Sequence, residues 1–237
     1  MESTQCKDID VIRMILLVVG VIMTECYYAT PGIMFIKYYK QKLPEKYLPT
    51  IQILTNFLNT INWTISGAKV EKLDVQKIIC NSIGALIGVV LIFYLWIIYS
   101  KNKRNEHLIY LFMIFNLFFQ IFYAIFKCTE DIIINQFLSG AFNILMYATP
   151  LIHTMNAYRN KNRDIIPIVN VTFGAIASFI WTIYGILGVV FCKGNDKETL
   201  ISNSISFVIL IPNMIVYFRM HKQESRLSTS QPLNINE

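Results

Sequence analysis

The sequence predicts an all-α membrane protein with seven transmembrane helices, arranged as two parallel three-helix repeats that one linker helix joins (3+1+3). Three observations lead to this fold class. Hydrophobic residues make up 54% of the 237 residues and charged residues only 15%, whereas about a quarter of an average soluble chain is charged. A set of sequence motifs occurs twice, and the basic residues gather in alternate loops.

The apolar residues fall into seven runs, each close to the roughly 17–25 residues that cross a bilayer as a helix. The runs cover residues 14–36, 48–68, 78–99, 108–126, 132–155, 165–191 and 200–218. Backbone groups in lipid need hydrogen-bond partners within their own segment, so each run is expected to be helical. The first run is too long for a removable signal peptide, and it carries a motif that the second half repeats.

Three short motifs define the internal repeat. Tyr-Ala-Thr-Pro, Trp-Thr-Ile and Asn-Ser-Ile, which begin at Tyr28, Trp63 and Asn81, recur after 119, 118 and 122 residues. A parallel repeat of three spans needs one inverting helix, and it predicts two similar bundles with a site between them. The expected parts are an N-terminus at 1–10, a first repeat at 11–100, a linker helix at 105–127, a second repeat at 130–221 and a disordered polar tail at 222–237.

The charge distribution predicts the orientation in the membrane. The loops after the first, third and fifth runs, together with the C-terminal tail, hold 13 basic and five acidic residues, and the rest of the chain holds eight basic and ten acidic residues. Because positive charge collects on the cytosolic side, we expect a cytosolic C-terminus and an N-terminus outside or in a lumen. The net charge of +6 therefore reflects topology and not nucleic-acid binding. The plasma membrane is the favoured location, and an endomembrane is the alternative.

The sequence contains none of the motifs that are typical of enzymes or metal sites. There is no HExxH, no CxxC and no phosphate-binding glycine loop, so we expect no catalytic activity, no metal and no cofactor. Cys128 and Cys192 fall in or near loops on the non-cytosolic side and could form a disulfide, a question that the sequence leaves open.

Four prolines fall at one depth on the predicted cytosolic side. Pro49 and Pro167 lie at helix starts, where proline is common without any functional reason. Pro31 and Pro150 lie near the ends of the first and fifth helices, where proline interrupts the hydrogen-bond ladder and favours a kink. The four together predict a hinge and gate.

Polar and aromatic residues at matching positions of the two units predict a binding site. Polar groups inside transmembrane helices usually face the interior of the bundle, and the carboxamides of Asn81 and Asn203 can both donate to and accept from a hydroxyl-rich solute. Trp63 and Trp181 offer flat faces that could sandwich a sugar ring, although a membrane tryptophan is also commonly an interface anchor.

Helical spacing extends this predicted site. Residues four apart share a helix face, which puts Asn59 beside Trp63 and favours a wet cavity over lipid. The same spacing adds one position in the sixth helix and two each in the first and fifth helices, which are Ala177, Thr24, Tyr27, Asn143 and Met146. Such a cavity, polar but with few charges, suits an uncharged solute.

The motifs together resemble those of the SWEET sugar transporters. The resemblance covers about residues 10–221 and rests on the four prolines, the two Trp-x-x-x-Gly elements and the two Asn-Ser-Ile elements. It implies energy-independent uniport of mono- or disaccharides by alternating access, with Asn81 and Asn203 binding the sugar and Trp181 stacking on it. It also implies sugar and lipid as the partners, with a homo-oligomer as a further option.

Two positions depart from the pattern of this family. Ser66 stands where many members have a tyrosine, and only Tyr184 keeps it in the second unit, which implies an asymmetric outer gate. Glu25 lies in the middle of the first helix, where the family is usually apolar. Glu25 keeps open one alternative, a proton-coupled small-solute exporter of the PQ-loop type. A sorting protein similar to the KDEL receptor is the other.

Overall fold

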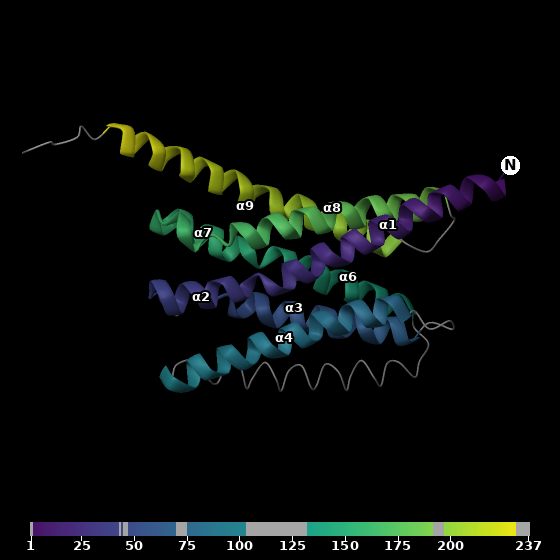
Figure 1. Ribbon diagram of the computed structural model, residues 1–237, viewed down its shortest axis with the longest axis horizontal. Helices are drawn as coiled ribbons and strands as arrows, with labels where there is room; N and C mark the ends of the chain where they lie inside the picture. Colours follow the sequence, from purple (N-terminus) through teal and green to yellow (C-terminus); the bar gives the residue numbers. More distant parts are fainter. Residues whose placement is uncertain are drawn as a thin grey trace, which may run out of the picture.

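The computed structural model describes residues 2–42, 44, 47–69, 75–102, 132–191 and 197–230, and these ranges contain helices and no strand (Figure 1). The elements of the first half are α1 (Glu2–Ala29), α2 (Pro31–Gln41), α3 (Thr50–Lys69) and α4 (Val75–Asn102). Those of the second half are α6 (Ile132–Ala148), α7 (Pro150–Asn160), the short 3₁₀ helix η2 (Arg163–Ile165), α8 (Ile168–Phe191) and α9 (Lys197–Ser230). The order of long helices is therefore the same in both halves.

Six of the seven predicted runs coincide with described helices. The run at 108–126 and the expected linker helix at 105–127 lie outside the described residues, as do Cys128 and Cys192. Among the described residues, four helical segments are long and apolar enough to cross a membrane, namely Val11–Gln41, Lys77–Ser100, Ile168–Phe191 and Lys197–Gln223.

One end, the C-terminal one, differs from the prediction. The first helix begins at Glu2 and includes most of the N-terminal segment at 1–10, for which no structure was predicted. The last helix continues to Ser230, so the start of the tail that was expected to be disordered is helical. Polar composition argues against a packed core, but a helix that continues from a membrane span needs no core of its own.

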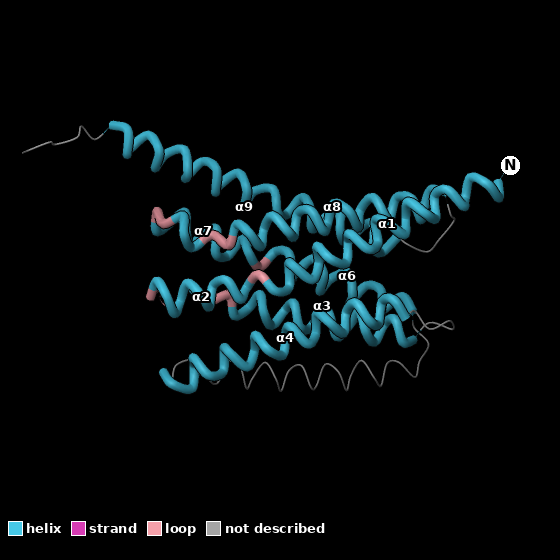
Figure 2. Tube along the Cα trace, in the orientation of Figure 1, coloured by secondary structure: helices cyan, strands magenta, loops and turns pink. Residues whose placement is uncertain are grey.

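The predicted interruptions at Pro31 and Pro150 are both present. Helix α1 ends at Ala29 and α2 starts at Pro31, and α6 and α7 are divided in the same way around Thr149 (Figure 2). Proline has no N–H, so the carbonyl four residues before it loses its helical partner. The hydroxyls of Thr30 and Thr149 donate at 2.7 Å to those two carbonyls, which belong to Tyr27 and Met146.

The two short helices after these prolines also end alike. Helix α2 is closed by Lys42 with φ 53° and α7 by Lys161 with φ 50°, the two positive-φ residues other than glycine in the described part of the chain. Left-handed backbone is uncommon outside glycine. The same unusual local geometry therefore recurs at equivalent places, which extends the repeat from sequence to structure.

The two halves meet through two equivalent pairs of helices. Helix α1 packs against α8, and α6 packs against α3, so each half offers its first and second long helix to the other. A buried cluster lies where they meet, built from Tyr27, Tyr28, Met146, Tyr147 and neighbours from α8 and α9. The interface of the two halves is thus largely aromatic at its centre.

Most basic residues of the described helices gather at one end of the bundle, which is here named the basic end. It is formed by the ends of α2 and α7, by η2, and by the last part of α9 (Figure 1). Lys37 donates to the main-chain carbonyl of Asp164 at 3.1 Å and links the two halves there. The side chains of Ile165 and Ile166, at most 1% exposed, pack in the cluster beneath this end.

Candidate functional site

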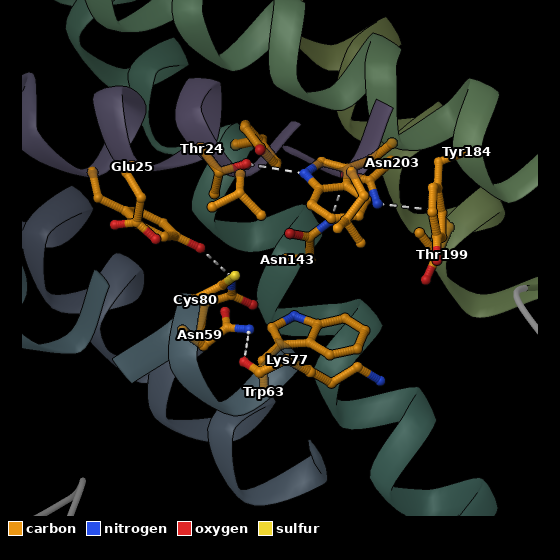
Figure 3. A pocket seen from close by; sticks show the side chains of 16 residues that line it. Thr24, Glu25, Asn59, Trp63, Lys77, Cys80, Asn143, Tyr184, Thr199 and Asn203 are labelled. Carbon is orange, nitrogen blue, oxygen red and sulfur yellow. Dashed lines mark hydrogen bonds between the residues drawn. The ribbon is translucent and has the colours of Figure 1, made fainter. Parts of the chain in front are cut away.

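A cavity opens between the two halves on the side of the aromatic cluster away from the basic end. Its volume of about 180 Å³ is far larger than the roughly 10–15 Å³ that one water needs on the same measure. The cavity is lined by Leu17, Val21, Thr24, Glu25, Tyr28, Asn59, Trp63, Lys77, Cys80, Asn81, Asn143, Tyr147, Trp181, Tyr184, Thr199 and Asn203 (Figure 3). Both halves contribute, and the lining combines aromatic rings with carboxamides.

The two repeat-related tryptophans lie on opposite halves of the cavity and have different surroundings. The indole N–H of Trp181 donates to the hydroxyl of Thr24 at 3.0 Å, so α8 and α1 are bonded at the cavity wall (Figure 3). Tyr184 packs edge-on against the Trp181 ring at 5.5 Å. Across the cavity, the ammonium of Lys77 lies 5.0 Å from the centre of the Trp63 ring. Each ring is therefore fixed in place by a polar neighbour.

The asparagines are held in a repeated geometry. Asn81 donates at 2.8 Å to the carbonyl of Lys77, and Asn203 donates at 2.8 Å to the carbonyl of Thr199, each four residues earlier in its helix. Asn143 donates to the carboxamide oxygen of Asn203 at 3.4 Å. Each NH₂ group has two donors, so both repeat-related amides retain a donor after these bonds. The helix backbone thus orients two equivalent carboxamides at the cavity wall.

Most of the predicted site residues meet at this cavity. Those that line it are Thr24, Asn59, Trp63, Asn81, Asn143, Trp181, Tyr184 and Asn203. Tyr27, Met146 and Ala177 do not line it; each is 0% exposed and packs behind the wall. The four prolines, Pro31, Pro49, Pro150 and Pro167, are buried between the cavity and the basic end.

The displacement of Tyr27 and Met146 has a simple helical reason. Consecutive residues point about 100° apart around a helix, and the cavity is lined by Tyr28 and Tyr147 instead. These tyrosines follow Thr24 and Asn143 by four residues, so they share the face that those residues define. Helical spacing counted back from the prolines selects Tyr27 and Met146. Spacing counted forward from Thr24 and Asn143 selects Tyr28 and Tyr147, which are the residues on the cavity face.

The sequence held signals for some lining residues that the prediction missed. Tyr28 and Tyr147 open the first repeated motif. Glu25 and Lys77 are charged residues within apolar segments, which is a general mark of a functional position. Leu17, Val21, Cys80 and Thr199 are ordinary membrane residues, and nothing in the sequence distinguishes them.

Among the described residues that line the cavity, one carboxyl and one ammonium group carry charge. Glu25 and Lys77 line it from α1 and α4, and one carboxyl oxygen of Glu25 is buried with no hydrogen-bond partner among the described residues. No group of three or more histidine, cysteine or acidic residues that could hold a metal occurs in the described ranges. The chemistry that remains is hydrogen bonding and stacking on apolar faces.

The arrangement defines a class of protein. An all-helical membrane protein with a polar cavity between two parallel sequence repeats has the architecture of a secondary transporter. Comparison with known proteins shows which transporters the chain is similar to. A family model described as "Sugar efflux transporter for intercellular exchange" matches residues 134–225 of this chain. The matched model and the relatives described below carry the names of sugar transporters, in agreement with the expectation that the chain is not an enzyme.

The relatives and a solved structure match nearly the whole chain. The bidirectional sugar transporter SWEET8 of Arabidopsis thaliana is 23% identical over 96% of this chain and 96% of its own length. SWEET7 from the same plant is 22% identical over 92% of this chain and 84% of its own. The structure of a eukaryotic SWEET transporter matches with a TM-score of 0.68 and 18% identity, covering 90% of this chain and 99% of that one. At this identity the structural match establishes the fold.

Proposed function

We propose that the protein is a facilitative uniporter of mono- or disaccharides that works by alternating access, with the sugar held between the two repeats at the midplane of the membrane. The observation that carries this proposal is the pairing of equivalent residues across one cavity. Trp63 and Asn81 from the first half, and Trp181 and Asn203 from the second, line the same space. The relatives named above, described as bidirectional sugar transporters, support the choice of a sugar.

The residues suit the two chemical sides of a sugar. A pyranose ring has an apolar C–H face and a rim of hydroxyls. The indole faces of Trp63 and Trp181 would take the C–H faces, and the remaining amide donors and acceptors of Asn81 and Asn203 would take the hydroxyls. A polar site of this kind rejects solutes that lack the hydroxyls, because its own buried groups would stay unpaired.

The geometry around the cavity supports a gate at the basic end. Tyr27, Met146, Gln52 and Asn170 are each at most 2% exposed and lie between the cavity and the prolines. We propose that this layer closes one side, and that it opens by bending at Pro31 and Pro150 with the help of Pro49 and Pro167. Tyr184, at the opposite part of the cavity wall, would belong to the outer gate.

The membrane arrangement follows as part of the same proposal. Two parallel three-helix units would be joined by an inverting linker helix at 105–127, with the basic end and the C-terminus in the cytosol and the N-terminus outside or in a lumen. The favoured location is the plasma membrane, with an endomembrane as the alternative. The apolar side chains exposed along α4 and α9 would face lipid or, in a homo-oligomer, a second copy of the chain.

Uptake into proteoliposomes tests the proposal directly. The purified full chain is reconstituted, and the entry of radiolabelled glucose, fructose and sucrose is measured with and without a proton gradient. A uniporter equilibrates at least one of these sugars at a rate that the gradient does not change. Empty liposomes and the Asn203→Ala protein serve as controls. A native protein that moves none of the three sugars above the empty liposomes would overturn the proposal.

A second candidate, a proton-coupled exporter, is favoured by one observation. Glu25 places a carboxyl group in the cavity wall, where a proton could bind and leave during the cycle. In the same assay, a coupled carrier would accumulate solute against its concentration when a proton gradient is imposed. The Glu25→Gln protein would lose that accumulation while still exchanging solute across the membrane.

A further inference from the structure

A stripe of carboxamide side chains runs along one face of α3, from the cavity toward the basic end. Its members are Gln52, Asn56 and Asn59, which are 1%, 4% and 1% exposed. At about 100° per residue, these three and Trp63 fall within roughly 60° of one another around the helix. The stripe thus continues the line of the cavity-lining Trp63 and Asn59 beyond the cavity.

The two ends of the stripe place it at the interface between the halves. Asn59 donates to the hydroxyl of Tyr28 at 3.3 Å and to the sulfur of Met146 on α6 at 3.5 Å. Gln52 donates to the carboxamide oxygen of Asn170 on α8 at 2.6 Å. Asn56 lies between these contacts on the same helix face. A solute that crosses between the repeats passes along this interface.

Asn56 is the member of the stripe whose carboxamide forms no hydrogen bond with a described residue. Both its carboxamide nitrogen and its oxygen are buried without a hydrogen-bond partner among the described residues. Gln52 and Asn59 each have an unpartnered oxygen in the same sense. An unpaired buried amide lowers stability, and a leucine of similar size would avoid that cost. Three such groups along one helix face are explained if each of them forms a hydrogen bond in another state of the protein.

The wall that faces the stripe is formed by the equivalent positions of α8, and two of the three residues there are small. The residues 118 positions after Gln52, Asn56 and Asn59 are Asn170, Gly174 and Ala177. A Cβ atom on Gly174 would lie 2.9 Å from the Tyr27 ring, so this ring packs directly onto the glycine. Tyr27 precedes the Pro31 hinge by one helical turn. Bending at that hinge would move the Tyr27 ring off Gly174.

We propose that the α3 stripe is the inner part of the sugar's path, and that Asn56 is a transient binding site for sugar hydroxyls between the cavity and the basic end. When Tyr27 leaves Gly174, the carboxamide of Asn56 exchanges hydrogen bonds with the hydroxyls of the passing sugar. Gln52 releases Asn170 in the same movement and becomes the last contact. This inference rests on the proposed sugar transport and adds a second site to it.

Separate measurement of binding and exchange tests the inference. Asn56→Leu keeps the size of the side chain and removes its polar groups. Asn62→Leu is the matched control, because Asn62 is also buried, at 1% exposed, on the same helix but about 90° away from the stripe. In proteoliposomes, Asn56→Leu should slow radiolabelled glucose exchange about tenfold while glucose affinity stays within about twofold of the native protein. Asn62→Leu should change neither quantity.

Exchange by Asn56→Leu at the native rate, or a loss of affinity equal to its loss of rate, would overturn the inference. If the leucine protein does not fold, Asn56→Ser and Asn56→Ala replace it; the serine protein should exchange glucose faster, and equal rates would refute the site. The proposed function is checked by the native protein in the same experiment. A native protein that exchanges glucose while Asn56→Leu matches it rejects only the inner site, whereas a native protein without sugar exchange rejects both.

Discussion

Tyr27 donates its phenolic hydroxyl to the main-chain carbonyl of Met146 at 3.1 Å. These residues lie 119 positions apart, and each lies four residues before the proline that interrupts its helix. The Met146 carbonyl is free to accept this bond because Pro150 has no N–H to offer it. The carbonyl of Tyr27, freed by Pro31 in the same way, accepts from Asn170 at 3.0 Å. The two proline interruptions are therefore joined through the backbone groups that the prolines release.

Tyr27→Phe removes the bond between the hinges and leaves the ring in place. Because Thr149 still donates to the Met146 carbonyl, we expect a loss of about 0.5–1.5 kcal/mol in the stability of the state closed at the basic end. Exchange of sugar should become faster, and the temperature of thermal unfolding should fall. Tyr39→Phe, at an exposed tyrosine of α2, is the control. A Tyr27→Phe protein that resembles this control in both measurements would show that the bond has no part in closure.

Pro31→Ala and Pro150→Ala restore a backbone N–H at each hinge. The new N–H competes with Asn170 for the Tyr27 carbonyl, or with the Tyr27 hydroxyl for the Met146 carbonyl, and it favours a straight helix. We expect the exchange rate to fall more than sugar affinity does, since the hinge lies outside the cavity. Equilibrium binding and exchange flux are measured on the same preparation. Weaker binding with native exchange kinetics would argue against the hinge.

The sequence was sufficient for the helical class and for the paired tryptophans and asparagines of the cavity, because repeated motifs and apolar runs are local patterns. It misplaced Tyr27 and Met146, because a single residue of helical rotation separates the cavity from the packing behind it. It also missed Glu25 and Lys77 as lining residues. Their side chains line the cavity because of the way that α1 and α4 pack in the bundle. The spacing of residues within one helix does not predict how that helix packs against another.

Asn81→Ala and Asn203→Ala should each reduce sugar transport severely while the protein remains folded. Loss of one carboxamide leaves sugar hydroxyls unpaired in a desolvated site, at a cost of about 1–3 kcal/mol. Asn203→Ala should have the larger effect, because it also removes the acceptor of Asn143. Initial uptake rates are compared at equal amounts of reconstituted protein. Near-native uptake by both variants would remove these residues from the site.

Trp181→Phe should weaken sugar binding less than Trp181→Ala does. Phenylalanine keeps an aromatic face for the sugar, a stacking contribution of about 0.5–1.5 kcal/mol, but it loses the 3.0 Å bond to Thr24. Thr24→Val removes that bond together with the 2.8 Å bond from the Thr24 hydroxyl to the Gly20 carbonyl, keeps the indole ring, and should weaken binding about as much as Trp181→Phe does. Binding is measured on purified protein with glucose. Equal losses for phenylalanine and alanine would indicate an interfacial anchor and exclude stacking.

Gly185→Ala should destabilise the protein although it adds only one methyl group. Gly185 ends the Trp-x-x-x-Gly element of α8, and a Cβ there would lie 2.8 Å from the Cα and 2.9 Å from the backbone nitrogen of Leu200 on α9. Backbone cannot rotate away as a side chain can, so α8 and α9 must separate, at a cost of about 1–3 kcal/mol. Trp181 and Asn203 lie on these two helices, so sugar affinity should fall as well.

Gly32→Ala is the control, because its Cβ would meet Leu91 at an ordinary 3.6 Å and alanine favours a helix. Thermal unfolding followed by tryptophan fluorescence should separate the two variants, and equal midpoints would contradict the close approach of α8 to α9.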